Sequence, residues 1–338
     1  VTNNSITITV SATNGTNPIS NYYYIINNET PVSTTSNAYT FSGLNAGETY
    51  TIKVYVVDTE GYSSDTSSLN VETENAILLA DWVISQYGGV QGNNGIYYHT
   101  SSLANSAGDN SYRYSGATPN NYVCFGSDAA TCPEENLYRI IGMFGDEVKL
   151  IRNYSIGNEP WSGSIYNQNN SWYSSTLNTS TLNNTFLNNF EQMWIDKISI
   201  HSWQIGGLTG SNGYSNGAQT AYNYEVGSNN AGSTDSMKIG LMYLSDYYYA
   251  ADTGYWLTDG MSYNDACNYN WLCLKSSEWV ISKRSDNSNS AFTISYTGFV
   301  GDYFVNATYA IRPTFYLNSN VSYASGTGTQ SDPIRLGI

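Results

Sequence analysis

Four cysteines are the residues whose types and spacing most directly suggest chemistry. They fall into two local pairs, Cys124 with Cys132 and Cys267 with Cys273. Three connectivities are open, and the short spacings favour two local disulfides in an oxidising compartment, with four reduced thiols as the alternative. Zinc is disfavoured, because neither pair has the two to four intervening residues of structural zinc sites and only two histidines could assist. We expect disulfides, no metal and no cofactor.

Motifs for catalysis or calcium binding are weak. A calcium-dependent lectin would carry Glu-Pro-Asn and a later Trp-Asn-Asp, whereas residues 158–161 read Asn-Glu-Pro-Trp and the second motif is absent. Four carboxylates could in principle pair for glycoside hydrolysis, but isolated carboxylates on polar loops are usually solvated. The four carboxylates in question are Asp246, Asp252, Asp259 and Asp265. We expect no enzymatic activity.

An aromatic segment between residues 247 and 271 is the better functional candidate. Aromatic faces stack on sugar rings or on apolar patches of partner proteins, and neighbouring Asp and Asn add directional hydrogen bonds. The Cys267–Cys273 loop would hold the segment in place. Some members could instead fill the core, above all Tyr247 and Tyr249. The residues expected to bind a ligand are Tyr255, Trp256, Tyr263, Tyr269 and Trp271.

The composition favours an exported surface protein. Among 338 residues there are 32 Tyr and only 12 Lys and Arg, in a background of Asn, Ser, Thr and Gly that is typical of recognition loops. A net charge of −15 repels phosphate backbones and anionic lipids, which excludes nucleic-acid and membrane-surface binding. No stretch approaches the length of a transmembrane helix. Because the chain opens directly into an alternating strand, we expect a mature or excised fragment.

Residues 1–74 alternate apolar and polar positions between turn signals, which predicts an all-β sandwich. Residues 42–58, Ser-Gly-Leu-Asn-Ala-Gly-Glu-Thr-Tyr followed by a long strand pattern, resemble the fibronectin type III signature. The resemblance implies that Tyr50 hydrogen-bonds back across a corner. The early-strand Trp of that family is absent, and residues 22–24, all Tyr, could fill its volume. We assign no chemistry to this domain.

Residues 75–338 follow another pattern. Residues 76–87 fit a helix that Gly88 and Gly89 would end, and residues 181–194 fit a second helix with an apolar stripe. Short strand-like runs and long Gly/Asn/Ser loops surround them, the longest at 206–236. Two helices among many short strands predict an α+β domain with function on its loops.

Ordered motifs near the C-terminus supply a family resemblance. Residues 278–282 read Glu-Trp-Val-Ile-Ser, 291–294 Ala-Phe-Thr-Ile, and 309–317 Tyr-Ala-Ile-Arg-Pro-Thr-Phe-Tyr-Leu. Over about residues 76–338 the series resembles the DUF6273-type domain of Firmicutes surface proteins. It is also similar to C-type-lectin-like and formylglycine-generating-enzyme-like folds, which implies a compact core bearing variable loops. Arg312 lies inside an apolar strand, so we expect it to form a structural ion pair or to clamp backbone carbonyls.

Together these features predict an extracellular, cell-surface adhesin or ligand-binding module. It would recognise a glycan or a protein without catalysis or a cofactor. The alternative is a structural subunit of an extracellular filament or surface layer, whose N-terminal strand could extend a neighbour's sheet. An enzyme or a phage-borne receptor-binding protein has less support.

Overall fold

The computed structural model describes residues 1–163, 169–214, 217–230, 232–257 and 266–337. The chain divides into two compact units, Val1–Ile77 and Leu78–Ile338. Each unit has its own buried apolar cluster. Within the described residues, no helix is long and apolar enough to cross a membrane.

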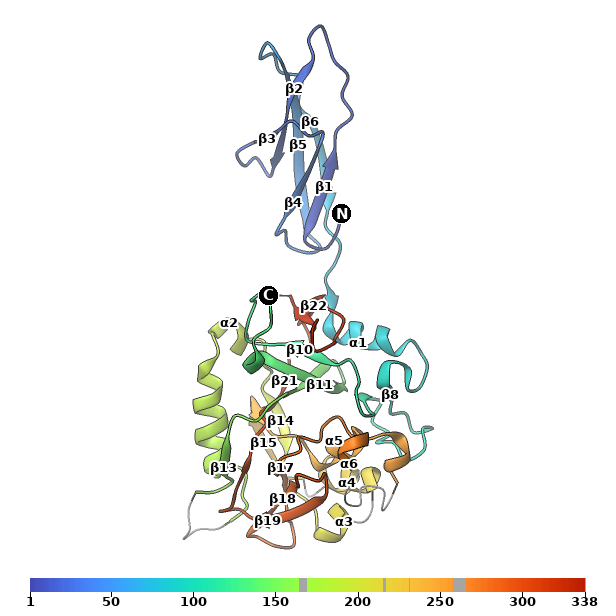
Figure 1. The fold of residues 1–338 in the computed structure, drawn as a ribbon, viewed down its shortest axis with the longest axis vertical. Coiled ribbons are helices and arrows are strands. Elements are labelled where there is room, and N and C mark those ends of the chain that lie inside the picture. Colours follow the sequence, from blue (N-terminus) through green and yellow to red (C-terminus); the bar gives the residue numbers. More distant parts are fainter. Residues whose placement is uncertain (164–168, 215–216, 231, 258–265, 338) are drawn as a thin grey trace. The chain divides into compact units, whose positions relative to one another are not determined.

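The N-terminal unit is a sandwich of two antiparallel sheets (Figure 1). One sheet pairs β1 with β4, and the other has the order β3-β2-β5-β6. Alternating residues from both sheets meet in one core, where Ile6 and Phe41 face Tyr24, Ile26 and Ile52. The strands are β1 (Ser5–Thr9), β2 (Ile19–Ile26), β3 (Val32–Thr34), β4 (Ala38–Ser42), β5 (Thr49–Asp58) and β6 (Ser67–Glu72). The predicted all-β sandwich is therefore confirmed.

Tyr50 makes the expected corner contact at the start of β5. Its hydroxyl oxygen accepts a hydrogen bond from the Asn45 backbone N–H at 2.8 Å. The Thr73 hydroxyl donates to the Asn45 carbonyl at 2.6 Å, so both main-chain polar groups of Asn45 are satisfied. These bonds fix the turn between β4 and β5.

The C-terminal unit is built around two larger sheets. A seven-stranded sheet has the order β16-β21-β12-β11-β9-β8, with β10 paired to β11, and a five-stranded sheet has the order β13-β20-β17-β18-β19. Smaller sheets pair β14 with β15 and order β23-β22-β7. The strands are β7 (Ile77–Leu78), β8 (Ile96–Tyr98), β9 (Tyr112–Tyr114), β10 (Tyr122–Cys124), β11 (Leu137–Phe144), β12 (Glu147–Arg152), β13 (Asn158–Pro160), β14 (His201–Gln204), β15 (Thr234–Met237), β16 (Ile239–Gly240), β17 (Glu278–Lys283), β18 (Ser290–Ile294), β19 (Val300–Phe304), β20 (Thr308–Ala310), β21 (Thr314–Leu317), β22 (Ser322–Ser325) and β23 (Arg335–Leu336).

Helices lie beside these sheets and outnumber the two that the sequence predicts. The α-helices are α1 (Leu79–Tyr87), α2 (Gln192–Ile195), α3 (Gly210–Tyr214), α4 (Gly217–Glu225), α5 (Leu244–Tyr249) and α6 (Ala266–Tyr269). A ten-residue π-helix is η3 (Leu177–Phe186), and the 3-10 helices are η1 (Asn93–Gly95), η2 (Glu134–Asn136), η4 (Leu187–Asn189) and η5 (Thr253–Tyr255). The prediction of one long loop at 206–236 is wrong, because Ala218, Ala221 and Glu225 form the buried stripe of α4. Figure 1 shows α4, α5 and α6 grouped near β17.

The two predicted helices have different outcomes. The first is confirmed as α1, which ends at Gly88 in the left-handed conformation with φ 59°. The second is wrong as a single helix, because Phe190 adopts extended backbone angles and separates η3 and η4 from α2. The Phe190 ring packs edge-on against Phe125 and Phe186, so tertiary packing overrides the helical stripe.

Candidate functional site

Two of the predicted ligand-binding residues belong to the core. Trp256 is 2% exposed, and its indole N–H donates to the Ala251 carbonyl at 3.0 Å. Trp271 is 6% exposed, donates to the Tyr114 carbonyl at 2.9 Å, and lies against the Arg139 guanidinium at 4.4 Å. Neither ring presents a free face to solvent. The prediction that they lie at a binding surface is therefore wrong. Burying a large aromatic ring is more favourable than leaving it in contact with water.

Two exposed tyrosines of this region, Tyr269 and Tyr296, and the half-buried Tyr255, which packs against the core, form what we call the tyrosine patch. The rings of Tyr255 and Tyr269 stack at 4.9 Å with an interplanar angle of 24°. Tyr269 is 38% exposed and Tyr296 is 68% exposed. Cys267 Sγ lies 3.8 Å from the Tyr296 carbonyl oxygen, so the two loops are neighbours. Tyr263 lies outside the described residues.

Both predicted local disulfides are present, Cys124–Cys132 and Cys267–Cys273. The second disulfide closes the loop that carries Tyr269. Asn270 of this loop also forms an isolated antiparallel β-bridge with Ala251. Asn270 is buried and donates to the Tyr247 carbonyl at 2.7 Å. Tyr269 is thus mounted on a loop that is fixed both covalently and by hydrogen bonds.

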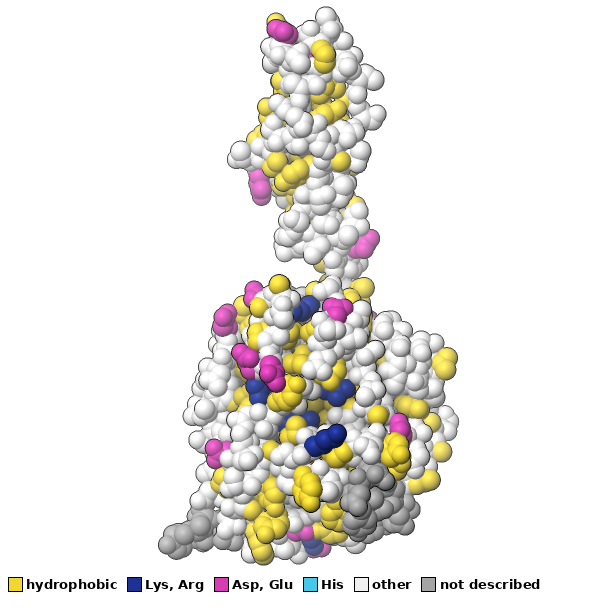
Figure 2. Space-filling model, viewed as in Figure 1, with side chains coloured by type: hydrophobic (Ala, Val, Ile, Leu, Met, Phe, Trp, Pro, Cys, Tyr) yellow, Lys and Arg dark blue, Asp and Glu magenta, His cyan; other side chains and the backbone are white. Residues whose placement is uncertain are grey.

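Charged side chains are sparse in this chain as a whole. Charged residues make up 12% of the chain, and Figure 2 shows the viewed face of each unit mostly white and yellow, with few Lys, Arg, Asp or Glu. The Tyr247 and Tyr249 rings lie in the core, where their hydroxyls donate to the Gly298 and Asn105 carbonyls. Recognition at this surface would rest on stacking and neutral hydrogen bonds rather than on ion pairing.

Arg312 forms the predicted structural ion pair. Its Nε and Nη2 contact the two Glu278 carboxylate oxygens at 2.7 Å each, and Nη2 also donates to the Leu272 carbonyl. Both side chains are buried. Burial raises the pKa of Glu278 above its ordinary value, and the Arg312 guanidinium opposes that rise. The pair joins the start of β17 to the segment between β20 and β21.

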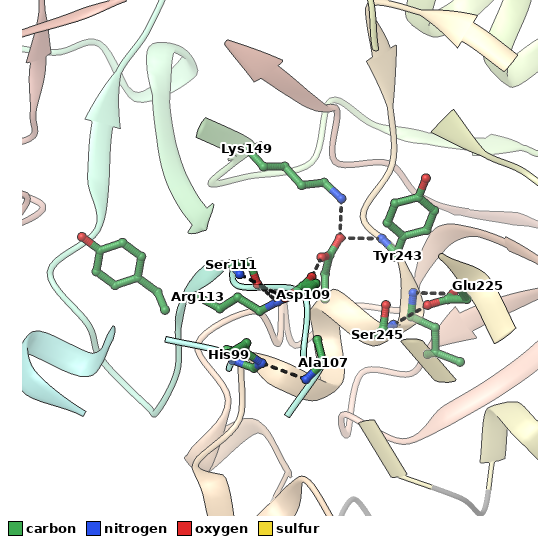
Figure 3. A network of polar contacts seen from close by, with 12 residues as sticks. His99, Ala107, Asp109, Ser111, Arg113, Lys149, Glu225, Tyr243 and Ser245 are labelled. Carbon is green, nitrogen blue, oxygen red and sulfur yellow. Dashed lines mark hydrogen bonds and ion pairs between the residues drawn. The ribbon is translucent and has the colours of Figure 1, made fainter. Parts of the chain in front are cut away.

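A second buried cluster surrounds the carboxylate of Asp246 at the start of α5, and Figure 3 labels its partners Lys149, Arg113 and Tyr243. Lys149 Nζ contacts Asp246 Oδ2 at 2.6 Å, and Arg113 Nη1 lies 3.4 Å from Oδ1. The Tyr243 backbone N–H donates to Oδ2 at 2.8 Å. Arg113 Nη2 also contacts Asp109 at 2.7 Å. Strands β9 and β12 thereby present two cations to one helix terminus.

Burial controls the electrostatics of this cluster. It lowers the pKa of Lys149 below its ordinary value, although the Asp246 carboxylate opposes the shift. Burial alone would also lower the pKa of Arg113, but the carboxylates of Asp109 and Asp246 outweigh it and hold that pKa above its ordinary value. Burial lowers the pKa of His99 well below its ordinary value, and Arg113 adds to the effect, so the imidazole is neutral.

Glu225 holds the same helix terminus from the other side. Its carboxylate accepts hydrogen bonds from the backbone N–H groups of Leu244 and Ser245 at 2.9 and 2.8 Å, and from the Ser282 hydroxyl. Burial raises the pKa of Glu225, and these donors oppose the rise. Carboxylates at Glu225 and Asp246 therefore satisfy the free N–H groups that begin α5.

The ionised carboxylate of Asp109 should stabilise the fold at neutral pH, and this contribution should be lost in acid. Burial would raise its pKa, but Arg113 and Ser111 lower it to about 2. A depressed carboxyl pKa stabilises the fold above the unfolded-state pKa of about 4, and this stabilisation is lost as the pH falls toward 2. In urea titrations we expect Asp109→Asn to lower the free energy of unfolding by about 2 kcal/mol at pH 7 and progressively less below pH 4. A deficit that stays constant down to pH 2.5 would contradict this origin.

The buried charged side chains of this cluster are poor candidates for catalytic residues. Lys149, Arg113 and Asp246 are at most 3% exposed, so a substrate would not reach them in this conformation. Among the described residues, no group of three or more His, Cys, Asp or Glu could hold a metal ion. Residues 213–217 read Gly-Tyr-Ser-Asn-Gly, the sequence pattern of a nucleophile elbow, but Gly213 and Tyr214 belong to α3, whereas a nucleophile elbow follows a strand. Ser215 lies outside the described residues.

Sequence reasoning treated Asp246 as a solvated loop carboxylate, and the structure corrects this. Asp246 is buried at the third position of α5, where its carboxylate caps the Tyr243 N–H. Asp252 is exposed, and Asp259 and Asp265 lie outside the described residues. A usable signal was Lys149 itself, a lysine inside the apolar run Val-Lys-Leu-Ile at 148–151. A buried lysine requires a partner, but the sequence does not show which carboxylate it is.

Comparisons with known proteins give limited coverage. No family model matches the chain, and no curated protein does. Among solved structures, a chitinase from Bacillus thuringiensis is similar over 22% of this chain and 12% of its own, at 26% identity and a TM-score of 0.20. Fibronectin(III)-like modules of Clostridium thermocellum CbhA are similar over 22% of this chain and 82% of theirs, at 18% identity and a TM-score of 0.19. The chain thus spans about an eighth of the chitinase's length. The DUF6273-type resemblance has no support from a family match.

Proposed function

We propose that the chain is a non-catalytic, extracellular glycan-binding module. The observation that carries the proposal is the stacked pair of Tyr255 and Tyr269, of which Tyr269 lies on the loop closed by the Cys267–Cys273 disulfide. A fixed aromatic face loses little entropy when a sugar ring stacks on it. Two disulfides support an oxidising, extracellular location on a cell surface.

The domain families follow as part of the proposal. The N-terminal sandwich serves as a fibronectin type III-like spacer, which the Tyr50 corner bond supports. The C-terminal unit is a DUF6273-type, C-type-lectin-like domain that carries the binding loops. The buried Arg312–Glu278 pair supports this domain assignment in one respect, because it gives the Arg-Pro motif a structural role.

Substitution in the tyrosine patch tests the glycan proposal. On a glycan array followed by calorimetry with the best ligand, we expect Tyr255→Ala with Tyr269→Ala to weaken binding at least about tenfold, because each lost stacking contact is worth about 1 kcal/mol. The matched control is Tyr173→Ala, which removes a tyrosine that is also exposed but lies outside the patch. Absence of any glycan ligand, or equal affinity of the double variant, would refute the proposal. A protein ligand lost in the same variant would redirect it to protein recognition.

Self-assembly is the second candidate, and one observation favours it. Strand β19 lies at the end of the five-stranded sheet, and its Tyr303 and Phe304 are both exposed. Such an edge can pair with a strand of another copy, which would make the chain a subunit of a filament or surface layer. Electron microscopy and sedimentation decide this point. Monodisperse monomers over a wide concentration range would count against assembly.

A further inference from the structure

The contact between Lys149 and Asp246 has the arrangement that an intramolecular amide bond requires. Lys149 comes from β12 and Asp246 from the first turn of α5, 97 residues later in the chain. Nζ and Oδ2 are 2.6 Å apart, and the exposures of the two side chains are 0% and 1%. We infer that the Lys149 amine and the Asp246 carboxyl condense after folding to form a covalent cross-link.

The surroundings of the amine favour its neutral, nucleophilic form. Nζ lies 4.3 Å from the Tyr243 ring centroid and 5.0 and 5.1 Å from those of Tyr316 and Trp203. Burial among these rings excludes water and penalises the charge on the ammonium, and the Asp246 oxygen that Nζ contacts is the acceptor for the proton that must leave before attack. The lowered pKa of Lys149 agrees with this direction.

The carboxyl group is held in position for attack. Arg113 Nη1 lies 3.4 Å from Oδ1, and the Tyr243 backbone N–H donates to Oδ2 at 2.8 Å (Figure 3). Arg113 is itself fixed by Asp109 at 2.7 Å, so its charge is preorganised where an oxyanion would develop. A nucleophile and a carboxyl held in contact also gain the rate advantage of an intramolecular reaction.

The reaction balances without another reactant. After proton transfer, the Lys149 lone pair attacks Asp246 Cγ, and the carbonyl electron pair moves onto Oδ1 beside Arg113. The second amine proton passes to the Oδ2 hydroxyl, the Cγ–Oδ2 bond breaks, and water leaves while the carbonyl at Oδ1 re-forms. One N–C bond replaces one C–O bond, and the only product lost is one water molecule.

Intact-mass spectrometry of the purified full chain tests the cross-link. After reduction under denaturing conditions, we expect a mass lower than the sequence mass by one water molecule. Lys149→Met and Asp246→Ala should each restore the full sequence mass of the variant. The control Lys238→Met, which removes a lysine that donates only to backbone carbonyls, should keep the deficit. A folded wild-type chain at full mass would overturn the inference.

Peptide mapping locates the bond without relying on any variant. Trypsin should fail to cut after Lys149 and should release a branched peptide that joins residues 140–152 to residues 239–275. A lost water that instead maps to a cyclised aspartyl residue, with normal cleavage after Lys149, would overturn the cross-link. The result is independent of glycan binding, because the tyrosine patch contributes no atom to this reaction.

Discussion

Arg312→Ala should lower the free energy of unfolding of the C-terminal unit by about 3–5 kcal/mol at pH 7, because it leaves a buried carboxylate without its cation. Glu278 is 1% exposed, and both of its oxygens depend on Arg312 at 2.7 Å. Urea titration followed by tryptophan fluorescence measures this unit alone, since all 8 Trp residues of the chain lie within it.

The pH dependence identifies the cause of that loss. The pKa of Glu278 is already raised by burial, and removing Arg312 raises it further. A raised carboxyl pKa means that the folded state binds a proton that the unfolded state releases, so stability falls as the pH rises through this range. The deficit of Arg312→Ala should therefore be larger at pH 7 than at pH 5. A deficit that does not change with pH would assign the loss to packing instead.

A compensating pair and a surface control complete this test. Arg312→Met combined with Glu278→Leu removes both charges and should recover most of the lost stability, because apolar side chains of similar volume can replace a buried pair. Arg284→Ala breaks the ion pairs with Asp286 and Asp302 nearer the surface and should cost only about 1 kcal/mol. Equal losses for Arg312→Ala and Arg284→Ala would contradict the role of burial.

The sequence predicts local features well where one short pattern determines them. The alternation of residues 1–74, the glycine that ends α1, the Tyr50 corner and the two disulfides each depend on a few neighbouring residues. Arg312 is a partial exception: it lies between β20 and β21 and not inside a strand as predicted, but an arginine within an apolar run of the sequence still requires a partner. The identity of that partner, Glu278, depends on how β17 and β20 pair.

The sequence fails where one residue type suits two environments. Tyrosine and tryptophan serve equally in a core and at a binding surface, so Trp256 and Tyr269 look alike until their burial is known. Asp246 looks like a loop carboxylate because its partners, Lys149 and Arg113, come from strands 97 and 133 residues earlier in the chain. Contacts over such distances are fixed by the packing of sheets and helices, which no local pattern encodes.

Asp246→Ala should be among the most destabilising single substitutions in the chain, with a loss of about 3–5 kcal/mol at pH 7. The change removes the cap of the Tyr243 N–H and leaves two buried cations facing a methyl group. Arg113 keeps Asp109 at 2.7 Å, whereas Lys149 keeps only its aromatic neighbours. In this variant Lys149 therefore bears most of the unpaired charge, and burial without the carboxylate should hold its pKa below the ordinary value.

The Asp246→Ala variant should regain stability at alkaline pH, which loss of the helix cap alone would not produce. A depressed lysine pKa destabilises the fold while the pH is below it, and the penalty is relieved as the pH rises toward the unfolded value of about 10.4. Urea titrations should therefore find Asp246→Ala closer to wild type at pH 9 than at pH 7. Adding Lys149→Met removes the titrating amine and should abolish the recovery. If the double variant recovers equally, the charge on Lys149 is not the cause, and loss of the helix cap would explain the instability.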